Sequence, residues 1–404
     1  METLTNKRIL LGVTGGIAAY KSAELIRRLQ DRHAEVQVVM TKSACEFITP
    51  LTMQALSGKP VYVHLLDHET EAGMGHIELA RWSDVILVAP ATANFIARLS
   101  HGLADDLLSA LCLAADVPLL IAPAMNQQMW LNQATQANIE TLTSRGIRLA
   151  GPAAGSQACG EVGPGRMLEI PELITVLNSI FDTRLLEGKC VMVTAGPTQE
   201  AIDPVRYISN RSSGRMGFAI ARAAVEAGAR VTLVSGPVAL PAPDRVNYIP
   251  VRTAIEMREA VLADVVNQDI FISAAAVADY HCAEVANEKI KKADGDLVLA
   301  LRKNPDILLE VSQLPKHPFT VGFAAETDAV KANALAKLKN KGLDMIAANQ
   351  VGEGMGFESE DNSLEVIWNG GNINLGLNTK DKIARQLIGI VAKQYNDRQS
   401  PQVH

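Results

Sequence analysis

The chain is poor in cysteine. Its 404 residues contain five, at Cys45, Cys112, Cys159, Cys190 and Cys282. No two of them form a C-x-x-C pair, so the sequence predicts neither a disulfide framework nor a structural zinc site. Scattered reduced thiols are typical of a cytoplasmic protein, and the polar first residues do not resemble a signal peptide. We therefore expect a cytoplasmic location.

Basic charge and long apolar runs are scarce as well. Lys and Arg number 38 against 44 Asp and Glu, which gives a net charge of −6. A general nucleic-acid-binding protein needs a basic face to neutralise phosphates, so no nucleic acid is expected as a partner. The most apolar stretches, such as 85–97, contain polar or proline breaks and fall short of the roughly 20 residues that span a membrane. No membrane partner is expected either.

What the chain does have is an alternation of apolar runs and helical patterns. Runs at 9–13, 35–40, 85–89 and 118–122 predict strands, and 18–30 predicts a helix. Almost wholly apolar strands of this kind are buried on both faces of a sheet. This rhythm predicts an α/β fold with a parallel, doubly wound sheet and ligands at the carboxyl ends of the strands.

A polar connector at 182–189 predicts a boundary between two domains, 1–188 and 189–404. The second domain is again doubly wound and Rossmann-like, with a mainly parallel sheet. Strands are expected there at 191–195, 230–235, 269–274 and 345–348. Helices are expected at 214–227, 331–341 and 379–395, and a terminal hairpin at 363–375.

A glycine-rich segment separates the last strand of the first domain from a helix expected at 172–181. Residues 151–166 contain five glycines and two prolines. Such a composition predicts no regular element, and we expect a mobile flap that carries Cys159 near its middle. A purely structural thiol is the alternative for this cysteine.

Two segments, 9–21 and 191–198, each read as a strand, a glycine-bearing turn and the start of a helix. Free backbone N–H groups and the helix dipole at such a turn favour a phosphate. In the first segment Gly15 and Gly16 match neither G-x-G-x-x-G nor a P-loop, so a tight turn without a ligand is the alternative. Hydroxyl and amide groups in 90–94 add donors at a second strand end, which favours a bound nucleotide.

Two further side chains of the first domain are candidates for chemistry. His76 starts a helical stretch, where it is either a cap or surface residue or a base near neutral pH. Asn126 directly follows a buried strand within 123–130. Its amide could bind a carboxylate, and core packing would explain Met129 and Trp130 but not this asparagine.

Together these segments resemble the homo-oligomeric flavin-containing cysteine decarboxylase family, whose fold is flavodoxin-like. The specific parts are the Pro-Ala-Met-Asn segment that starts at Pro123 and the flap around Cys159. The resemblance implies a bound FMN, which accepts a hydride so that the oxidised substrate can lose CO₂. The FMN-binding residues that it implies are Gly15, Gly16, Thr41, Thr92 and Asn94.

The same resemblance implies individual roles. His76 acts in the oxidative decarboxylation, Asn126 binds the substrate carboxylate, and Cys159 is the proton donor of the last step. Met125, next to Asn126, also binds the substrate. A flap suits that donor because it can close over a reactive enethiol. The family builds its FMN site between subunits, as trimers that group into a dodecamer.

The second domain has an unusually long polar loop at 196–217. It carries Arg206, Asn210, Arg211 and Arg215 and ends at a helix start, which predicts an anion site with forked donors. An exposed basic loop is the alternative.

Asp279 follows small residues after an expected strand, where it could meet a base, a ribose or a magnesium ion. Lys289 opens a cluster of three lysines. A solvated charged turn is the usual meaning of such a cluster. The neighbouring 304–308 and the basic helix 331–341 favour a triphosphate clamp instead.

This half resembles the phosphopantothenate–cysteine ligase domain, which is expected to dimerise. The family activates the phosphopantothenate carboxylate with CTP and Mg²⁺, and the cysteine amine then attacks the acyl-cytidylate. The resemblance implies that Asn210 and Arg206 bind the substrate or intermediate, that Lys289 supports catalysis, and that Asp279 contacts Mg²⁺. The implied CTP-binding residues are Ala275, Asp279, Lys289, Pro305, Asp306, Ile307, Leu308, Phe323, Lys337 and Lys341.

Over nearly its whole length the chain thus resembles the bifunctional family of coenzyme A biosynthesis. The implied substrates are 4′-phosphopantothenate, cysteine and CTP, and the implied product is 4′-phosphopantetheine. Two other hypotheses stay open. A two-domain NAD(P)-dependent dehydrogenase would need the G-x-G-x-x-G turn that is missing here, and a non-catalytic regulatory flavoprotein would release no CO₂. The sequence alone does not decide between CTP and ATP.

Overall fold

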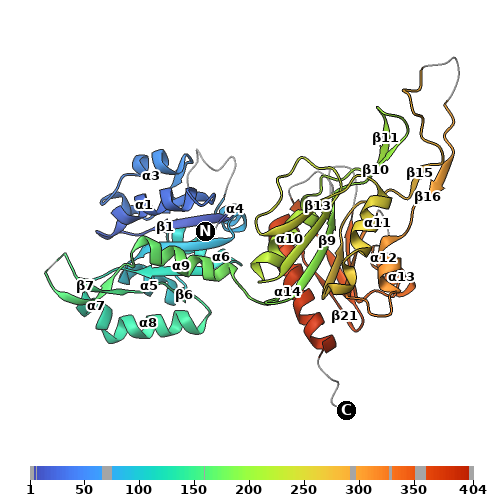
Figure 1. Ribbon diagram of the computed structural model, residues 1–404. Coiled ribbons are helices and arrows are strands. Elements are labelled where there is room, and N and C mark those ends of the chain that lie inside the picture. The colour runs from blue at the N-terminus through green and yellow to red at the C-terminus, as the bar shows by residue number, and fades with distance from the viewer. Residues whose placement is uncertain are drawn as a thin grey trace, which may run out of the picture. The chain divides into compact units, whose positions relative to one another are not determined.

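A computed structural model of the protein describes residues 4–5, 7–65, 75–158, 160–291, 297–326, 330–350 and 361–399. Contacts within the chain divide it into two compact units, Met1–Phe181 and Asp182–His404. Each unit is an α/β body with a central sheet (Figure 1). Within the described ranges, none of the helices combines the length and the apolar character needed to cross a bilayer.

The first unit is built on a six-stranded sheet in the order β3-β2-β1-β4-β5-β6. All neighbouring strands are parallel. This is the Rossmann order, and without the short edge strand β3 it is the flavodoxin order. The strands are β1 (Arg8–Val13), β2 (Glu35–Met40), β3 (Val61–Tyr62), β4 (Val85–Ala91), β5 (Leu119–Pro123) and β6 (Arg148–Leu149).

Helices cover both faces of this sheet, so the predicted doubly wound class is confirmed. Along β1, Leu11 packs with α1, α3 and α9 on one face, and Leu10 packs with α4, α5, α6 and α8 on the other. The helices are α1 (Ala19–Gln30), α2 (Lys42–Cys45), α3 (Pro50–Ser57), α4 (His76–Trp82), α5 (Ala93–Ser100), α6 (Leu107–Ala114), α7 (Gln127–Leu131), α8 (Gln133–Ser144) and α9 (Ile170–Phe181).

The glycine-rich segment differs from its prediction, because it contains regular structure. Strands β7 (Ala153–Ser156) and β8 (Val162–Arg166) form an antiparallel hairpin. Two glycines permit it: Gly155 has φ 153° and Gly165 has φ 135°, a region of backbone space that only glycine enters readily. The expectation of a segment without regular structure is wrong, because glycine and proline, which usually interrupt strands, here lie within the paired strands.

The second unit has an eight-stranded sheet in the order β13-β12-β9-β14-β17-β18-β20-β21. Its first six strands are parallel and repeat the Rossmann order, and β20 and β21 form the predicted antiparallel hairpin. The strands are β9 (Cys190–Ala195), β12 (Arg230–Ser235), β13 (Val246–Pro250), β14 (Ile270–Ser273), β17 (Phe319–Glu326), β18 (Met345–Gln350), β20 (Glu365–Trp368) and β21 (Gly371–Asn374).

Three small two-stranded ribbons accompany this sheet. The long polar loop predicted after β9 contains the hairpin of β10 (Gln199–Ala201) and β11 (Tyr207–Ser209). The other two ribbons pair β15 (Tyr280–Cys282) with β16 (Leu301–Lys303), and β19 (Asp361–Asn362) with β22 (Asn378–Thr379).

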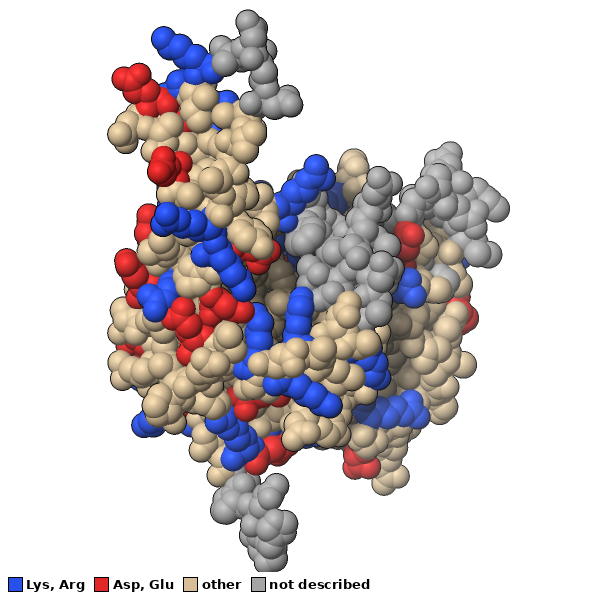
Figure 2. All heavy atoms as spheres, turned by 90° about the vertical axis from the view of Figure 1, so that its right-hand side faces the viewer, with Lys and Arg blue, Asp and Glu red and all other residues tan. Residues whose placement is uncertain are grey.

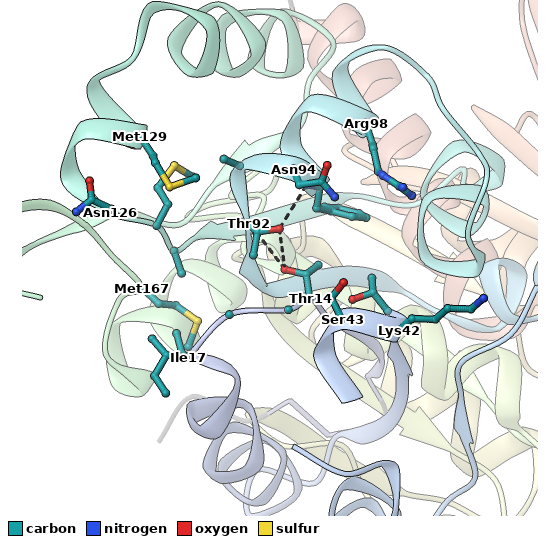
Figure 3. A pocket seen from close by; sticks show the side chains of 18 of the residues that line it. Thr14, Ile17, Lys42, Ser43, Thr92, Asn94, Arg98, Asn126, Met129 and Met167 are labelled. Atoms are coloured by element: carbon teal, nitrogen blue, oxygen red, sulfur yellow. Dashed lines mark hydrogen bonds between the residues drawn. The ribbon is translucent and has the colours of Figure 1, made fainter. Parts of the chain in front are cut away.

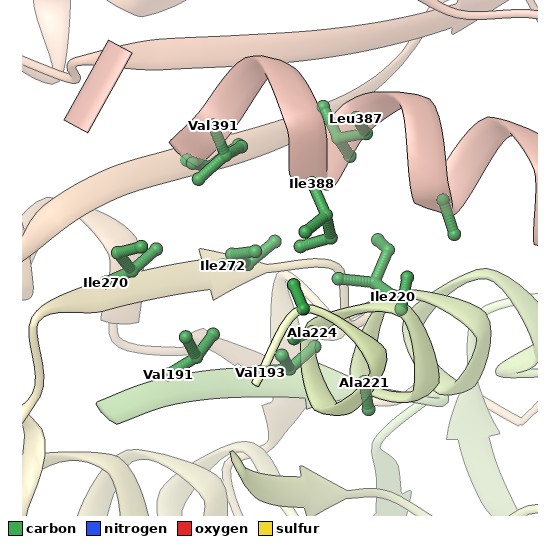
Figure 4. Packing of buried hydrophobic residues seen from close by; sticks show 14 of the residues in the cluster. Val191, Val193, Ile220, Ala221, Ala224, Ile270, Ile272, Leu387, Ile388 and Val391 are labelled. Atoms are coloured by element: carbon green, nitrogen blue, oxygen red, sulfur yellow. The ribbon is translucent and has the colours of Figure 1, made fainter. Parts of the chain in front are cut away.

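Helices again cover both sheet faces. On one face α10 and α14 pack together over β9 and β14, and Figure 4 shows Ile220 and Ile388 meeting above Val193 and Ile272. On the other face lie α11, α12 and α13. The helices are α10 (Arg215–Glu226), α11 (Ala254–Leu262), the 3₁₀ turn η1 (Val265–Asn267), α12 (Ile307–Ser312), α13 (Val330–Asn340) and α14 (Lys380–Gln399).

Two candidate active sites

The first unit has a cavity of about 1230 Å³ where β1 and β4 end. These two strands flank the point at which the strand order reverses, which is where doubly wound sheets bind ligands. The turn after β1, the start of α2, the turn after β4, the segment after β5 and the β7–β8 hairpin all contribute to its lining. Seven predicted site residues line it: Gly15, Gly16, Thr41, Thr92, Asn94, Met125 and Asn126.

Hydroxyl groups join the two turns at the base of this cavity. The buried Thr14 Oγ1 donates to Pro90 O at 2.8 Å and accepts from the Thr92 backbone N–H at 3.1 Å. Thr92 in turn caps α5, where its Oγ1 accepts from the N–H of Phe95. Figure 3 shows Thr14 and Thr92 side by side with Asn94 next to them. This network fixes the spacing of the two turns. The role of Thr14 in it was not predicted from the sequence.

The two glycines after β1 serve different purposes. A Cβ on Gly15 would collide with Ser43, whose backbone C and O atoms would be 2.8 Å away. At Gly16 a Cβ would only meet Thr92 Cγ2 at 3.5 Å, an ordinary contact. The protein's own packing therefore requires Gly15 to be glycine, whereas at Gly16 it leaves room beside the turn. Within the described residues, the N–H groups of residues 15–18 have no hydrogen-bond partner, and they are available to an anion.

The charged side chains around this cavity fall into two groups. Arg98 is paired with Asp105 and Asp106 at 2.8 and 2.9 Å, and Lys21 and Arg166 are both paired with Glu169, at 2.8 and 3.1 Å. Lys42 and His64 also line the cavity, and no partner for either is found in the described part of the chain. Figure 3 shows Lys42 and Arg98 at the end of the cavity opposite Asn126. Sequence reasoning missed Lys42, although it stands directly after a strand end, next to the predicted Thr41.

Asn126 is held in one orientation. It is the N-cap of α7, where its Oδ1 accepts from the Gln128 N–H at 2.8 Å. The amide Nδ2 therefore faces the β7–β8 hairpin, and it donates to Glu161 Oε2 at 2.7 Å. Gln157 Oε1 accepts from the N–H of Gln127 at 3.0 Å, which ties the hairpin to α7.

Two predicted residues of this site cannot be placed. Cys159 lies outside the described residues, although both of its neighbours in the turn between β7 and β8 are described. Helix α4 begins at His76, but the side chain of this histidine lies outside the description.

The second unit has a cavity of about 570 Å³ at the carboxyl ends of β9 and β14. The strand order reverses here as well, so the position within the sheet is the same as in the first unit. Ten predicted site residues line it: Asn210, Ala275, Asp279, Pro305, Asp306, Ile307, Leu308, Phe323, Lys337 and Lys341.

Two amide side chains organise the loops around this second cavity. Asn210 Nδ2 donates to Val277 O at 3.0 Å, which joins the long loop after β9 to the turn after β14. The buried Asn304 donates to Ala278 O at 2.8 Å and faces His281 Nδ1 at 2.7 Å. Backbone carbonyls that would otherwise lack partners are thereby satisfied. The sequence analysis predicted 304–308 only as part of a triphosphate clamp, so this structural role of Asn304 was not predicted.

Positive charge dominates this cavity. Six cations line it: Arg211, Arg215, Lys303, Lys337, Lys341 and Lys380. The carboxylates are those of Asp279 and Asp306, and Asp306 is already paired with Lys341 at 2.8 Å. Figure 2 shows Lys and Arg side chains gathered on one face of this unit. A cleft lined by one sign of charge attracts ligands of the opposite sign, so this cavity suits a polyanion.

Arg206 and Lys289 do not line the cavity. Arg206 is paired with the buried Asp203 and donates to Ile290 O at 2.8 Å. Asp203 also accepts from the N–H of Ile290 at 3.1 Å, and the hydrogen bond from Arg206 holds the pKa of its carboxyl well below the usual range. Arg206 therefore fastens the segment that carries the exposed Lys289 to the β10–β11 hairpin.

No group of three or more His, Cys, Asp or Glu that could hold a metal ion is found among the residues that the structure describes. Asp279 is accordingly a single carboxylate at the edge of a basic cavity. Mg²⁺ commonly binds through one or two carboxylates together with the phosphates of a nucleotide, so the residues present fit a metal that arrives with a triphosphate.

Comparisons with known proteins assign both units. Residues 1–181 match the family described as Flavoprotein, and residues 186–395 match the family described as DNA/pantothenate metabolism flavoprotein C-terminal domain. The coenzyme A biosynthesis bifunctional protein CoaBC of Vibrio vulnificus (strain CMCP6) is 56% identical over 96% of this chain and 98% of its own length. The chain belongs to the CoaBC family. The protein of the same name in Escherichia coli (strain K12) is 52% identical over 98% of this chain and 99% of its own length. The one in Bacillus subtilis (strain 168) is 45% identical over 91% of this chain and 92% of its own length.

Membership of the CoaBC family confirms the resemblance drawn from the sequence and favours it over the dehydrogenase hypothesis. The Flavoprotein match covers the unit with the glycine and hydroxyl turns, and the other match covers the unit with the basic cavity. The protein is accordingly a bifunctional enzyme of coenzyme A biosynthesis with a decarboxylase unit and a ligase unit.

Proposed function

We propose that the second unit joins 4′-phosphopantothenate to cysteine with CTP and Mg²⁺, and that the first unit decarboxylates the resulting 4′-phosphopantothenoylcysteine to 4′-phosphopantetheine with FMN. The observation that carries this proposal is the contrast between two cavities at equivalent sheet positions. The first offers backbone N–H groups and hydroxyls beside a glycine turn, and three of its four cations, Lys21, Arg98 and Arg166, are already paired with carboxylates. The second is lined by six cations and two carboxylates.

In the first unit the residues fit FMN. The free N–H groups of residues 15–18 and the open side of Gly16 would hold its phosphate, with Thr41, Thr92 and Asn94 nearby. Bound FMN would supply the two-electron redox chemistry that makes loss of CO₂ from the cysteine carboxylate feasible.

The protein's own groups then bind and move protons. The Asn126 amide, oriented by its N-cap bond, would hold the substrate carboxylate. His76 would act in the oxidative decarboxylation and Cys159 would donate the final proton, as the resemblance implies. Met125, which lines the same cavity, would pack against the substrate.

In the second unit, Lys337 and Lys341 would neutralise the triphosphate of CTP, and Asp279 would contact the Mg²⁺ that it carries. Asn210 would contact the acyl-cytidylate from which pyrophosphate has left. Stabilising charge on the attacked phosphorus is the main requirement of this reaction. Lys289 would support the same step from the segment that Asp203 and Arg206 fix.

We further propose that the enzyme is cytoplasmic and works as a homo-oligomer built from trimers of the first unit and dimers of the second, up to a dodecamer. The family resemblance supports this assembly, and analytical ultracentrifugation would measure it.

One incubation tests the two reactions together. With 4′-phosphopantothenate, cysteine, CTP and Mg²⁺, we expect pyrophosphate, CO₂ and 4′-phosphopantetheine. Replacing CTP by ATP measures the nucleotide preference. Release of pyrophosphate without CO₂ by a flavin-loaded protein would contradict the proposal for the first unit.

Two variants separate the reactions. A Cys159→Ser variant should still form the amide but fail to finish the thiol product. A Lys289→Gln variant should lose amide formation and still decarboxylate substrate that is supplied ready-made. If either variant disabled both reactions without unfolding, the assignment of reactions to units would be wrong.

A further inference from the structure

The Asn126 amide, which the proposed function assigns to the substrate carboxylate, already binds a carboxylate of the protein. Its Nδ2 donates to Glu161 Oε2 at 2.7 Å. Because the N-cap bond to Gln128 fixes the other side of the amide, rotating Asn126 by 180° would cost that bond. The donor side of Asn126 therefore cannot turn away from the hairpin without loss to α7.

Glu161 occupies the position on Asn126 that a ligand carboxylate would take, and it can be displaced from there. Its side chain is exposed, and no other partner for it is found among the described residues. It directly precedes β8, and its carbonyl accepts the hydrogen bond from Gln157 N at 2.8 Å that closes the hairpin. The rest of the hairpin is held independently, by Gln157 to the N–H of Gln127 and by Met125 N to Gly165 O. Glu161 can therefore leave Asn126 while the hairpin stays in place.

We propose that Glu161 is a displaceable internal carboxylate that sets the carboxylate specificity of Asn126; the proposal rests on the function assigned to Asn126 above. A substrate carboxylate must replace Glu161 to reach the amide. The decarboxylated product has no such group, so Glu161 returns to Asn126 as the product leaves. Glu161 thereby weakens substrate binding but does not affect the product. While no substrate is bound, it gives the half-buried amide a shorter hydrogen bond than the 3.5 Å contact with Gln157 Oε1 does.

The test uses two stable ligands that differ only in the carboxylate. The first is the serine analogue of the substrate, 4′-phosphopantothenoylserine, which lacks the thiol that must be oxidised. The second is the matching ethanolamide. Dissociation constants are measured by titration calorimetry on the full-length, flavin-loaded protein, so the readout is binding and not turnover.

Removing this carboxylate in Glu161→Ala should tighten binding of the serine analogue by about three- to tenfold, the range expected for an exposed charge-assisted hydrogen bond. Binding of the ethanolamide should not change. Glu161→Gln keeps an acceptor without the charge and should give a smaller gain. Glu140→Ala removes one negative charge from the exposed face of α8 and serves as the control for net charge.

Weaker or unchanged binding of the serine analogue to Glu161→Ala would overturn the proposal. Glu161 would then stabilise the bound carboxylate or have no effect on its binding. An Asn126→Ala variant tests the underlying assignment separately. If it loses no affinity for the serine analogue relative to the ethanolamide, the role of Asn126 itself fails. If it does lose affinity while Glu161→Ala gains none, only the proposal for Glu161 fails.

Discussion

The two units place their cavities at the same point of the same strand order, yet the cavities differ in chemistry. In the first unit the connection from β1 to α1 is the short turn Thr14–Ala18, and its donors are backbone N–H groups and hydroxyls. In the second unit the connection from β9 to α10 runs from Gly196 to Gly214, contains its own hairpin and brings Arg211 to the cavity, where Arg215 at the start of α10 joins it. The sheet therefore fixes where a ligand binds, whereas the loops decide which ligand binds.

The largest expected effect tests whether the units are energetically separate. Leu387 in α14 and Leu25 in α1 are both fully buried, each in the core of its own unit. Leu387→Ala should destabilise the second unit by about 2–5 kcal/mol, and Leu25→Ala should do the same to the first. Hydrogen exchange followed by mass spectrometry measures each unit. Faster exchange in both units of a single variant would contradict the separation.

The next effect concerns the first cavity alone. Gly15→Ala places a Cβ against the Ser43 backbone, and a displaced turn should lower decarboxylation about a hundredfold. Flavin absorbance should fall, while pyrophosphate release by the second unit should persist. Gly16→Ala is the comparison, because its Cβ meets the chain at an ordinary distance. Normal flavin content in Gly15→Ala would show that the turn does not hold the cofactor.

A cation of the second cavity gives a smaller effect. Arg215 lines the cavity and has no ion pair among the described residues, so Arg215→Gln should raise KM for CTP about tenfold or more. The loss should shrink at high salt. Lys339→Gln makes the same charge change outside the cavity and should leave KM unchanged. Equal effects of the two substitutions on KM would show that CTP responds to the overall electrostatic potential of the unit and does not bind at Arg215.

The smallest effect is a pH dependence of the ligase unit. The folded state lowers the pKa of Asp203, chiefly through the hydrogen bond from Arg206. Its carboxylate therefore stabilises the fold above the unfolded pKa of about 3.9, and this contribution is lost as the pH falls below that value. Unfolding of the second unit should be more acid-sensitive in the parent protein than in Asp203→Asn. Parallel pH profiles would show that Asp203 contributes nothing through its charge.

Sequence patterns predicted the fold best where strands are buried on both faces. The apolar runs at 85–89 and 118–122 begin within one residue of β4 and β5, because burial on both sides leaves a nearly continuous apolar signal. Helix α12 and strand β17 were not predicted, and the β7–β8 hairpin was predicted wrongly. Such short or glycine-containing elements owe their conformation to tertiary contacts, which one sequence does not reveal.

The candidate sites show the same limit. Residues next to strand ends, such as Gly15 and Asn126, could be named because parallel strands bring their ends together. The bond between Asn126 and Glu161 depends on the register of the hairpin, and the position of Lys289 depends on the buried Asp203. Neither pairing follows from spacing along the chain.

Mixing two variants tests the division of labour most directly. Asn126→Asp would repel the substrate carboxylate in the first unit, and Asn210→Asp would remove an amide donor from the second. With 4′-phosphopantothenate, cysteine, CTP and Mg²⁺, neither variant alone should release CO₂, whereas the mixture should release it because amide made by one chain can be decarboxylated by another. A mixture of folded variants that stays as inactive as each alone would contradict two separate active sites.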